Sequence, residues 1–486
     1  MEPSPNLSRM ALTALSSFSC RASLTARPAP SRSSCSKLSA LSVMWSAVTV
    51  SILRLEIFLP AVGAVLQILG FRSLRRENRW FTACWVLSLL RGAILLPALI
   101  LNATIWQETF YAAAGARLLY IGLSLQLALV LCFWCAVKTA RHGEPADAAK
   151  MLFVWYVVLT GLCRIGSGGI ISGLALLGAF IFVLRSLFSL AGEMEASGYS
   201  LEPARVKLSD TALARWIAAL VAVGIFCGYG FFGRYPMAWE KSTETLSSEA
   251  QTVKAELLSL GYPADALDDL TEEELLSCRG AVRIAVREND EPMNEGREVT
   301  SVEGNTTYVT HAYDVKEMHF TSVAVQLSAA PERWRIFHHF RWTEGTFCGT
   351  ESVQLWTAAY GGQSWTVNSD VSGCVLYDTA EGERVSAPYY SISEDDGGAL
   401  YAEFSFPYRA ANARGYVSYE TSPWEEGNLL NSWLNYTHQR SLIQYPVQTA
   451  VEARKTSGWD TPYAFITAQE ALQFWVYDGK IEMIGG

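Results

Sequence analysis

Long apolar runs fill the first half of the chain, and short alternating segments fill the second. Four runs are predominantly apolar over about 20 residues or more, namely Trp45–Phe71, Trp80–Leu101, Gly115–Val137 and Thr211–Phe232. A helix needs about 20 apolar residues to cross roughly 30 Å of hydrocarbon. The pattern predicts a polytopic α-helical membrane bundle in residues 44–234.

The stretch Met151–Leu190 is too long for a single crossing. It contains a glycine-rich break at Arg164-Ile165-Gly166-Ser167-Gly168-Gly169, which favours a tight helical hairpin. With this hairpin the bundle has about six spans. The sequence leaves open whether the stretch crosses once or twice.

Basic residues mark alternate loops of the predicted bundle. The second loop, Asn102–Ala114, has no Lys or Arg. The first, third and fifth loops have several: Arg72, Arg75, Arg76 and Arg79; Lys138, Arg141 and Lys150; and Arg185, Arg205 and Lys207. Because basic loops stay in the cytoplasm, six spans place the C-terminal half on the opposite side of the membrane.

The N-terminal tail, residues 1–43, disagrees with this orientation. With six spans it would lie outside, yet it is rich in Ser and Arg and has one acidic residue, Glu2. Three readings stay open: the chain begins at Met44, the tail is a transit peptide, or the tail is inside and one span is misassigned. We favour Met44, with the tail disordered or absent from the mature chain.

Charge divides the chain in the same place as hydropathy. The net charge is −9, but residues from Tyr235 onward hold 17 Lys and Arg against 37 Asp and Glu. The preceding residues are therefore basic overall. A nucleic-acid partner needs a basic surface, so we expect none. The bilayer is the expected partner of the basic half.

Residues 235–280 predict a stalk helix, Trp239–Leu260, continuous with the last span, and then a short helix, Asp265–Cys278. Thr271 and Glu274 have the spacing of a capping box. The acidic run around them lacks the spacing of a calcium loop. We therefore interpret it as complementing a helix dipole.

Residues 281–422 alternate between apolar and polar positions, with turn residues between the segments. The strands expected are Gly280–Glu288, Tyr308–Tyr313, His319–Leu327, Trp334–Trp342, Ser352–Ala359, Gly373–Tyr377, Leu400–Pro407 and Gly415–Tyr419. They predict an antiparallel β-sandwich or jelly roll. Residues 423–486 read as a helical or mixed segment packed on it, with helices at Leu429–Tyr436 and Thr467–Phe474. The extramembrane fold class is therefore α+β.

Two ionisable side chains in the bundle suggest a functional pair. Arg91 lies in mid-span and Glu56 lies within the first span. Buried charges are costly in a membrane and often functional, so an ion pair is one hypothesis. The plainer interpretation, which we favour, is that Arg91 knits helices together.

The stretch Trp334–Trp342 is the most distinctive of the acidic half. On a strand His338 and His339 face opposite sides, so they cannot chelate one metal. Core packing is the favoured role of these aromatic residues, and a ligand-facing role is the alternative. The ligand-facing candidates are Trp334, His338, His339, Trp342, Trp356 and Trp365. Exposed aromatics beside carboxylates would suit a carbohydrate.

No nucleophile elbow, zinc-binding helix, phosphate loop or redox cysteine pair occurs, so we expect no cofactor and no metal. A disulfide between Cys348 and Cys374 is left open. We predict a membrane-anchored extracytoplasmic binding or sensory protein, with a small molecule, a carbohydrate or an envelope protein as ligand. A transporter or its accessory subunit, using Arg91 and Glu56, is the alternative, and a membrane enzyme comes third. The layout resembles that of bacterial membrane proteins with an external β domain, which implies the cytoplasmic membrane.

Overall fold

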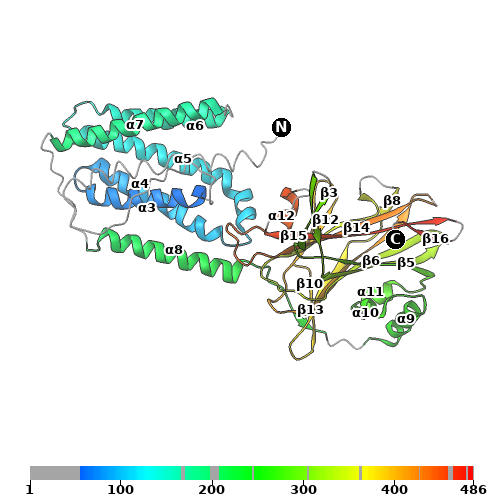
Figure 1. Ribbon diagram of the computed structural model, residues 1–486. Coiled ribbons are helices and arrows are strands. Elements are labelled where there is room, and N and C mark those ends of the chain that lie inside the picture. The colour runs from blue at the N-terminus through cyan, green and yellow to red at the C-terminus, as the bar shows by residue number, and fades with distance from the viewer. Residues whose placement is uncertain are drawn as a thin grey trace. The chain divides into compact units, whose positions relative to one another are not determined.

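The computed structural model describes residues 55–165, 170–196, 207–242, 246–303, 306–360, 364–425, 427–457, 464–477 and 480–484. The chain divides between Phe231 and Phe232 into two compact units. The first is helical and the second is rich in strands (Figure 1).

Six helices make up the described part of the first unit. They are α3 (Leu55–Leu74), α4 (Arg79–Leu101), α5 (Gln107–Ala140), α6 (Asp147–Ile165), α7 (Ile170–Ala196) and α8 (Asp210–Phe232). Five of them, all except α6, contain a segment long and apolar enough to cross a membrane. This confirms the prediction of a membrane-type bundle, with five such helices where the sequence suggested about six.

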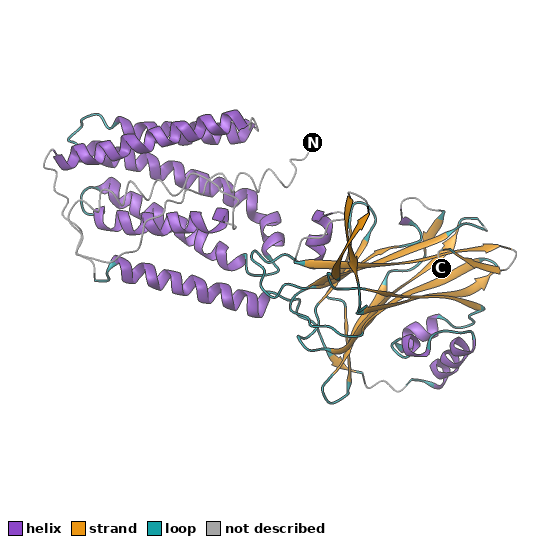
Figure 2. Ribbon diagram, in the orientation of Figure 1, coloured by secondary structure: helices purple, strands orange, loops and turns teal. Residues whose placement is uncertain are grey.

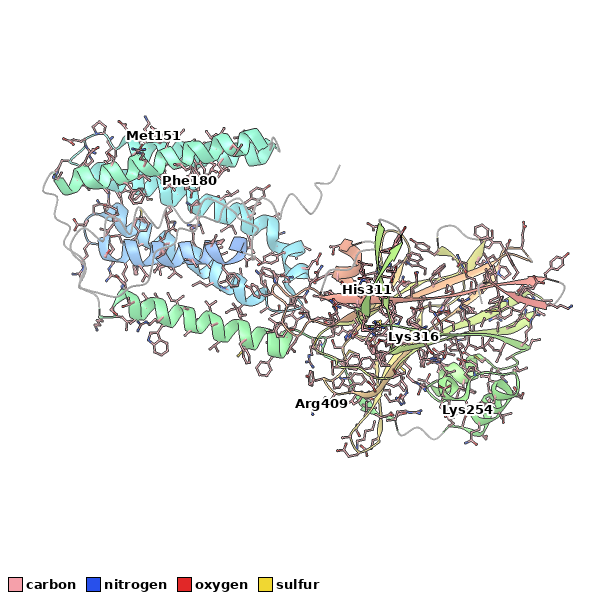
Figure 3. The ribbon with its side chains drawn as sticks, viewed as in Figure 1. Met151, Phe180, Lys254, His311, Lys316 and Arg409 are labelled. Carbon is pink, nitrogen blue, oxygen red and sulfur yellow. The ribbon has the colours of Figure 1, made fainter. Side chains whose placement is uncertain are left out.

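The predicted hairpin corresponds to α6 and α7, which pack side by side. The Trp155 indole donates to the Leu176 carbonyl oxygen at 3.1 Å, and its ring lies 4.7 Å from that of Phe180 (labelled in Figure 3). The glycine-rich break at 166–169 lies outside the described residues. α6 is 19 residues long, about 28 Å at 1.5 Å per residue.

Polar contacts gather the basic helix ends at one end of the bundle. Arg72, at the end of α3, donates to the Leu208 carbonyl oxygen at 2.6 Å and lies 3.4 Å from the Asp210 carboxylate. Arg141, after α5, lies 3.7 Å from Glu193 near the end of α7. The end of α8 is elsewhere, since a Cβ on Gly228 would lie 3.2 Å from the Ile100 carbonyl oxygen.

The described part of the second unit has two antiparallel sheets and a separate hairpin. The larger sheet has the order β1-β10-β9-β13-β6-β5-β2, with β8 beside β13, and the smaller has the order β11-β12-β7-β14-β15-β16. The hairpin is β3-β4, and His311 and Lys316 in Figure 3 mark it and the loop after it. The bounds are β1 Glu240–Lys241, β2 Arg283–Glu291, β3 Arg297–Glu303, β4 Thr306–Ala312, β5 Met318–Ala329, β6 Glu332–Trp342, β7 Glu351–Trp356, β8 Trp365–Val367, β9 Ser372–Asp378, β10 Arg384–Pro388, β11 Ser391–Glu394, β12 Leu400–Phe404, β13 Ala411–Pro423, β14 Leu430–Gln439, β15 Phe465–Tyr477 and β16 Lys480–Met483.

The two sheets enclose a core, and the larger sheet also has a covered outer face. From β6, Trp334 and Phe340 face the smaller sheet, whereas Phe337 faces α9 (Ser248–Ser259), α10 (Ala264–Leu267) and α11 (Glu272–Ser277). Figure 2 shows these helices beside the strands. The antiparallel sandwich is confirmed, and every expected strand segment overlaps an observed strand.

The helices expected near the C-terminus are wrong. Leu429–Tyr436 lies almost entirely in β14, a central strand of the smaller sheet, and Thr467–Phe474 lies in β15 beside it. Both segments have apolar residues that fit a helical spacing and also alternate in burial. Periodicity cannot separate helix from strand in so short a run. Only α12 (Ala450–Ser457) is helical in the described part of this region.

The prediction that a stalk helix continues the last membrane span is also wrong. Residues 233–239, which are not helical, and β1 follow the end of α8, and α9 begins only at Ser248. Trp239 packs on the sandwich, with its ring 4.8 Å from that of Tyr377. Gly233 and Pro236 explain the break, because neither residue suits a helix interior. The helix expected over Asp265–Cys278 is likewise divided, into α10 and α11.

Candidate ligand-binding face

Most of the aromatic residues singled out from the sequence lie inside the sandwich. Trp334, His338, Trp342 and Trp365 are all buried. His338 joins the two sheets, with Nδ1 2.7 Å from the Ser322 hydroxyl and Nε2 2.8 Å from the Ser432 hydroxyl. Burial lowers the pKa of His338 to about 3, so its ring is neutral and acts as a polar bridge within the core.

His339 faces the helices on the other side of the larger sheet. Its Nε2 lies 2.8 Å from the Tyr262 hydroxyl, and burial lowers its pKa to about 3. Its Nδ1 has no hydrogen-bond partner among the described residues. The pocket beside it has room for about one water molecule. That pocket is lined by Asp265, Ala266, Asp269, His319, Thr321, His339, Phe340 and Arg341, and it is too small for an organic ligand.

The acidic run of α10 and α11 holds these helices against the larger sheet. Asp269 accepts from Nε of Arg414 at 2.8 Å, and Glu274 accepts from Nη2 of Arg335 at 2.6 Å. All four side chains are buried. The Thr271 hydroxyl accepts from the Glu274 amide at 3.3 Å, which is one half of the predicted capping box. The Glu274 carboxylate is used by Arg335 instead.

The described residues contain no group of three or more His, Cys, Asp or Glu placed to hold a metal ion. Cys348 and Cys374 are both free thiols. They lie in different places in the domain, since Cys374 belongs to the helix-covered face of the larger sheet and the Cys348 thiol donates to the Gln439 carbonyl oxygen. The disulfide left open by the sequence is therefore not formed.

Arg91 has a neutral partner in the bundle. Its Nη1 donates to Oε1 of Gln67 at 2.5 Å, and both side chains are buried. Glu56 lies in α3, but its side chain is outside the described residues. Gln67 is eleven residues further along the same helix, roughly 16 Å at 1.5 Å per residue. The Gln67 contact thus favours a structural role in which Arg91 joins α4 to α3, and the Glu56–Arg91 ion pair stays a prediction.

The outer side of the smaller sheet presents aromatic and amide side chains together. Burial alternates from Leu430 to Leu434 in β14 and from Ala468 to Phe474 in β15, so that Leu434 and Leu472 point into the core while Trp433 and Gln473 point outward. Directly opposed residues share one side of a sheet, and Trp433 opposes Trp356 of β7. We call this surface the aromatic–amide face. It comprises Trp356, Tyr360, Asn431, Trp433, Gln473, Trp475 and Tyr477.

Its rings form two groups. The Trp356 ring stacks on that of Tyr360, 4.8 Å away at an interplanar angle of 6°, and lies 6.5 Å from that of Trp433. Further along β15, Trp475 is 42% exposed and Tyr477 is 70% exposed. Trp433 opposes Ala471, four residues before Trp475, so the two groups are roughly 13 Å apart along the strand.

An amide pair lies between the two groups of rings. Asn431 and Gln473 are directly opposed on β14 and β15. The Asn431 Oδ1 accepts from Nε1 of Trp433 and from Nε2 of Gln473, each at 2.6 Å. These two bonds fix the orientation of both amides. They leave the Asn431 Nδ2 group and the side-chain oxygen of Gln473, Oε1, without a hydrogen-bond partner in the part of the chain described.

Helix α12 covers the neighbouring part of the same sheet. Arg454 donates to Gln354 at 2.9 Å, and Phe465 packs against Ala450 and Ala453. Within the described residues the sheet is therefore covered beside Gln354, whereas Trp475 and Tyr477 on the same side are exposed.

Sequence reasoning selected Trp356 from this face and missed the rest. Trp433, Asn431, Gln473 and Trp475 lie in or beside the segments expected to be helices, where they would not share a surface. The alternation Leu430, Ser432, Leu434, Tyr436 is the signal that could have found them.

No family model and no curated protein matches this chain. Solved structures that are similar to parts of it include two collagen-binding domains. The collagen-binding domain from a Staphylococcus aureus adhesin is 11% identical over 29% of this chain and 86% of that domain, with a TM-score of 0.17. The collagen-binding domain of Erysipelothrix rhusiopathiae surface protein RspB is 11% identical over 39% of this chain and 79% of that domain, with a TM-score of 0.14. TM-scores this low carry no argument about ligand or function.

Proposed function

We propose that this chain is a membrane-anchored binding or sensory protein that displays its β-sandwich outside the cytoplasm and takes its ligand on the aromatic–amide face. The aromatic–amide face carries the proposal. Exposed rings of Trp and Tyr next to amides of fixed orientation are an arrangement that suits recognition, because the rings supply contact area and the amides supply direction.

The helix arrangement supports the extracytoplasmic location. The contacts of Arg72 with Asp210, of Asn78 with the Ala136 carbonyl oxygen and of Arg141 with Glu193 bring the basic ends of α3 and α5 to one end of the bundle. The positive-inside rule assigns that end to the cytoplasm. α6 runs antiparallel between α5 and α7, so counting it as a crossing puts the end of α8, and the sandwich after it, on the other side.

The charge of the second unit does not oppose this assignment, because a domain of this length crosses a membrane largely regardless of its charge. Signalling to the cytoplasm would need a separate partner, because the described connection between α5 and α6 is six residues long. The partner classes we propose are a small molecule, a glycan or a protein of the cell envelope.

Reporter fusions active on one side of the membrane test the proposal. They are placed after Lys150, after Arg205 and at Gly486 of the full chain. We expect the two loop fusions to report the cytoplasm and the Gly486 fusion to report the opposite side. A cytoplasmic Gly486 would mean that α6 does not cross, and the proposal would be abandoned.

A transporter is the second candidate, because Arg91 is a charged side chain buried among membrane-length helices. Arg91→Gln separates the two functions. The binding function predicts an unchanged affinity for ligand at the aromatic–amide face. A transporter predicts loss of flux with the sandwich still folded.

A further inference from the structure

Within the proposed binding function, on which this inference rests, we propose that the ligand of the aromatic–amide face is a neutral polysaccharide. Trp433 and Trp475 would stack on sugar rings, and Asn431 and Gln473 would hydrogen-bond sugar hydroxyls between them. Three features of the face lead to this ligand class: its rings, its free amide atoms and its charge.

The rings suit the faces of sugars. One face of a pyranose is lined by C–H groups, which pack favourably against the negative face of an aromatic ring. Trp475 is 42% exposed and Tyr477 is 70% exposed, so ring surface is open to solvent. The separation of roughly 13 Å along β15 between Trp433 and Trp475 exceeds the width of one sugar ring. The face therefore suits a chain of sugars rather than a monosaccharide.

The amides suit hydroxyl groups. A hydroxyl both donates and accepts a hydrogen bond. The Asn431 Nδ2 group can donate to it and the Gln473 Oε1 can accept from it, while Asn431 Oδ1 and Gln473 Nε2 are already engaged at 2.6 Å. The fixed orientation lowers the entropy cost of binding, because neither side chain has to be ordered by the ligand.

The charges on the face favour an uncharged ligand. The residues directly opposite Tyr477 and Trp475 on β16 are Lys480 and Glu482. One cation and one anion at the sheet edge offer no net attraction to an anionic glycan. Stacking of nucleic-acid bases would need a basic groove as well as rings, and this half of the chain is acidic.

The test is retention of the full-length protein on polysaccharides, in a zwitterionic detergent that has no sugar headgroup. The probes are cellulose, chitin, xylan, mannan and a β-1,3-glucan, with alginate and single-stranded DNA as anionic comparisons. We expect retention on at least one neutral polymer and none on alginate or DNA. Retention on none of the neutral polymers, or preferential retention on alginate or DNA, would overturn the inference.

Variants locate the binding. We expect Trp475→Ala and Trp433→Ala to weaken retention at least tenfold, and Trp475→Phe to keep most of it. Trp424→Ala is the matched control, since Trp424 is 67% exposed and follows β13 in the other sheet. Retention unchanged by Trp475→Ala, whose exposed side chain the fold does not need, would contradict the assignment.

This test and the reporter fusions fail separately. If the Gly486 fusion reports the outside and no neutral polysaccharide retains the protein, the proposal of a glycan ligand is wrong and the proposed binding function is unaffected. If the Gly486 fusion reports the cytoplasm, the proposed function is wrong, whether or not a polysaccharide retains the protein.

Discussion

His338 and His339 are adjacent in sequence and occupy different environments, because neighbouring residues of a strand face opposite sides. One lies between the sheets and the other lies under the helices, where Tyr262, Arg341 and Asp265 surround it. Burial lowers the pKa of both. Each ring is therefore neutral in the folded protein at neutral pH.

The two histidines predict acid instability of the sandwich. Their folded pKa of about 3 lies below the unfolded value of 6.5, so only the unfolded chain takes up these protons between the two values. The free energy of unfolding therefore keeps the whole contribution of these histidines above pH 6.5 and loses it as the pH falls toward 3. Each histidine accounts for a loss of about 4 kcal/mol in unfolding free energy at pH 3.

Urea unfolding of the full chain between pH 7 and 4, followed by tryptophan fluorescence, measures this slope. His339→Asn removes one titrating group, and we expect it to reduce the slope by close to one proton, whatever its effect at pH 7. An unchanged slope would show that His339 is protonated in the folded protein.

The buried ion pair of Asp269 and Arg414 gives a second prediction at this scale. Asp269→Asn leaves the buried guanidinium of Arg414 with one negative partner fewer. Breaking a buried ion pair lowers the free energy of unfolding by about 3 kcal/mol. The matched control is Asp370→Asn, because Asp370 is exposed and surface changes stay within about 0.5 kcal/mol. Thermal unfolding that does not separate the two variants would contradict the clamping role.

At the scale of elements, β14 and β15 show where sequence reasoning failed. Strands such as β5 and β6 could be predicted because their alternation is long and rich in β-branched or aromatic residues. The segments of β14 and β15 contain apolar residues at positions that fit both the helical period of 3.6 residues and the strand period of two. Their partner strands decide the outcome: β14 pairs with β7 on one side and β15 on the other, and a local pattern does not reveal such long-range pairing.

The same error concealed most of the candidate site. The face needs Asn431 opposite Gln473 and Trp433 opposite Trp356, and neither register follows from composition. Trp356 could be selected as an aromatic residue of a strand, and the membrane helices could be predicted because their length and apolarity suffice. The free space on the outer side of the smaller sheet depends on where α12 lies.

A substitution in β14 tests its central position. Leu434 is fully buried between the sheets, and Leu→Ala at such a site costs about 2–5 kcal/mol. Leu258→Ala is the control, because Leu258 of α9 is 43% exposed. We expect Leu434→Ala to lower the urea midpoint of the sandwich and Leu258→Ala to leave it nearly unchanged. Equal midpoints would place Leu434 outside the core.

At the scale of the whole molecule, hydropathy and charge change together near Tyr235. A basic, apolar unit with membrane-length helices precedes an acidic unit of packed sheets. The proposed role follows from this division and from the aromatic–amide face. The face has a function in the envelope only if it is open to the outside of an intact cell.

Labelling of Trp475→Cys with a membrane-impermeant maleimide in intact cells tests that claim most directly. The unsubstituted chain gives the background from native thiols, Leu434→Cys serves as a buried control, and Glu144→Cys marks the loop between α5 and α6. We predict labelling at position 475 in intact cells, none at 434, and labelling at 144 only after the membrane is permeabilised. Labelling at 144 but not at 475 in intact cells would contradict the account, because it would place the sandwich in the cytoplasm.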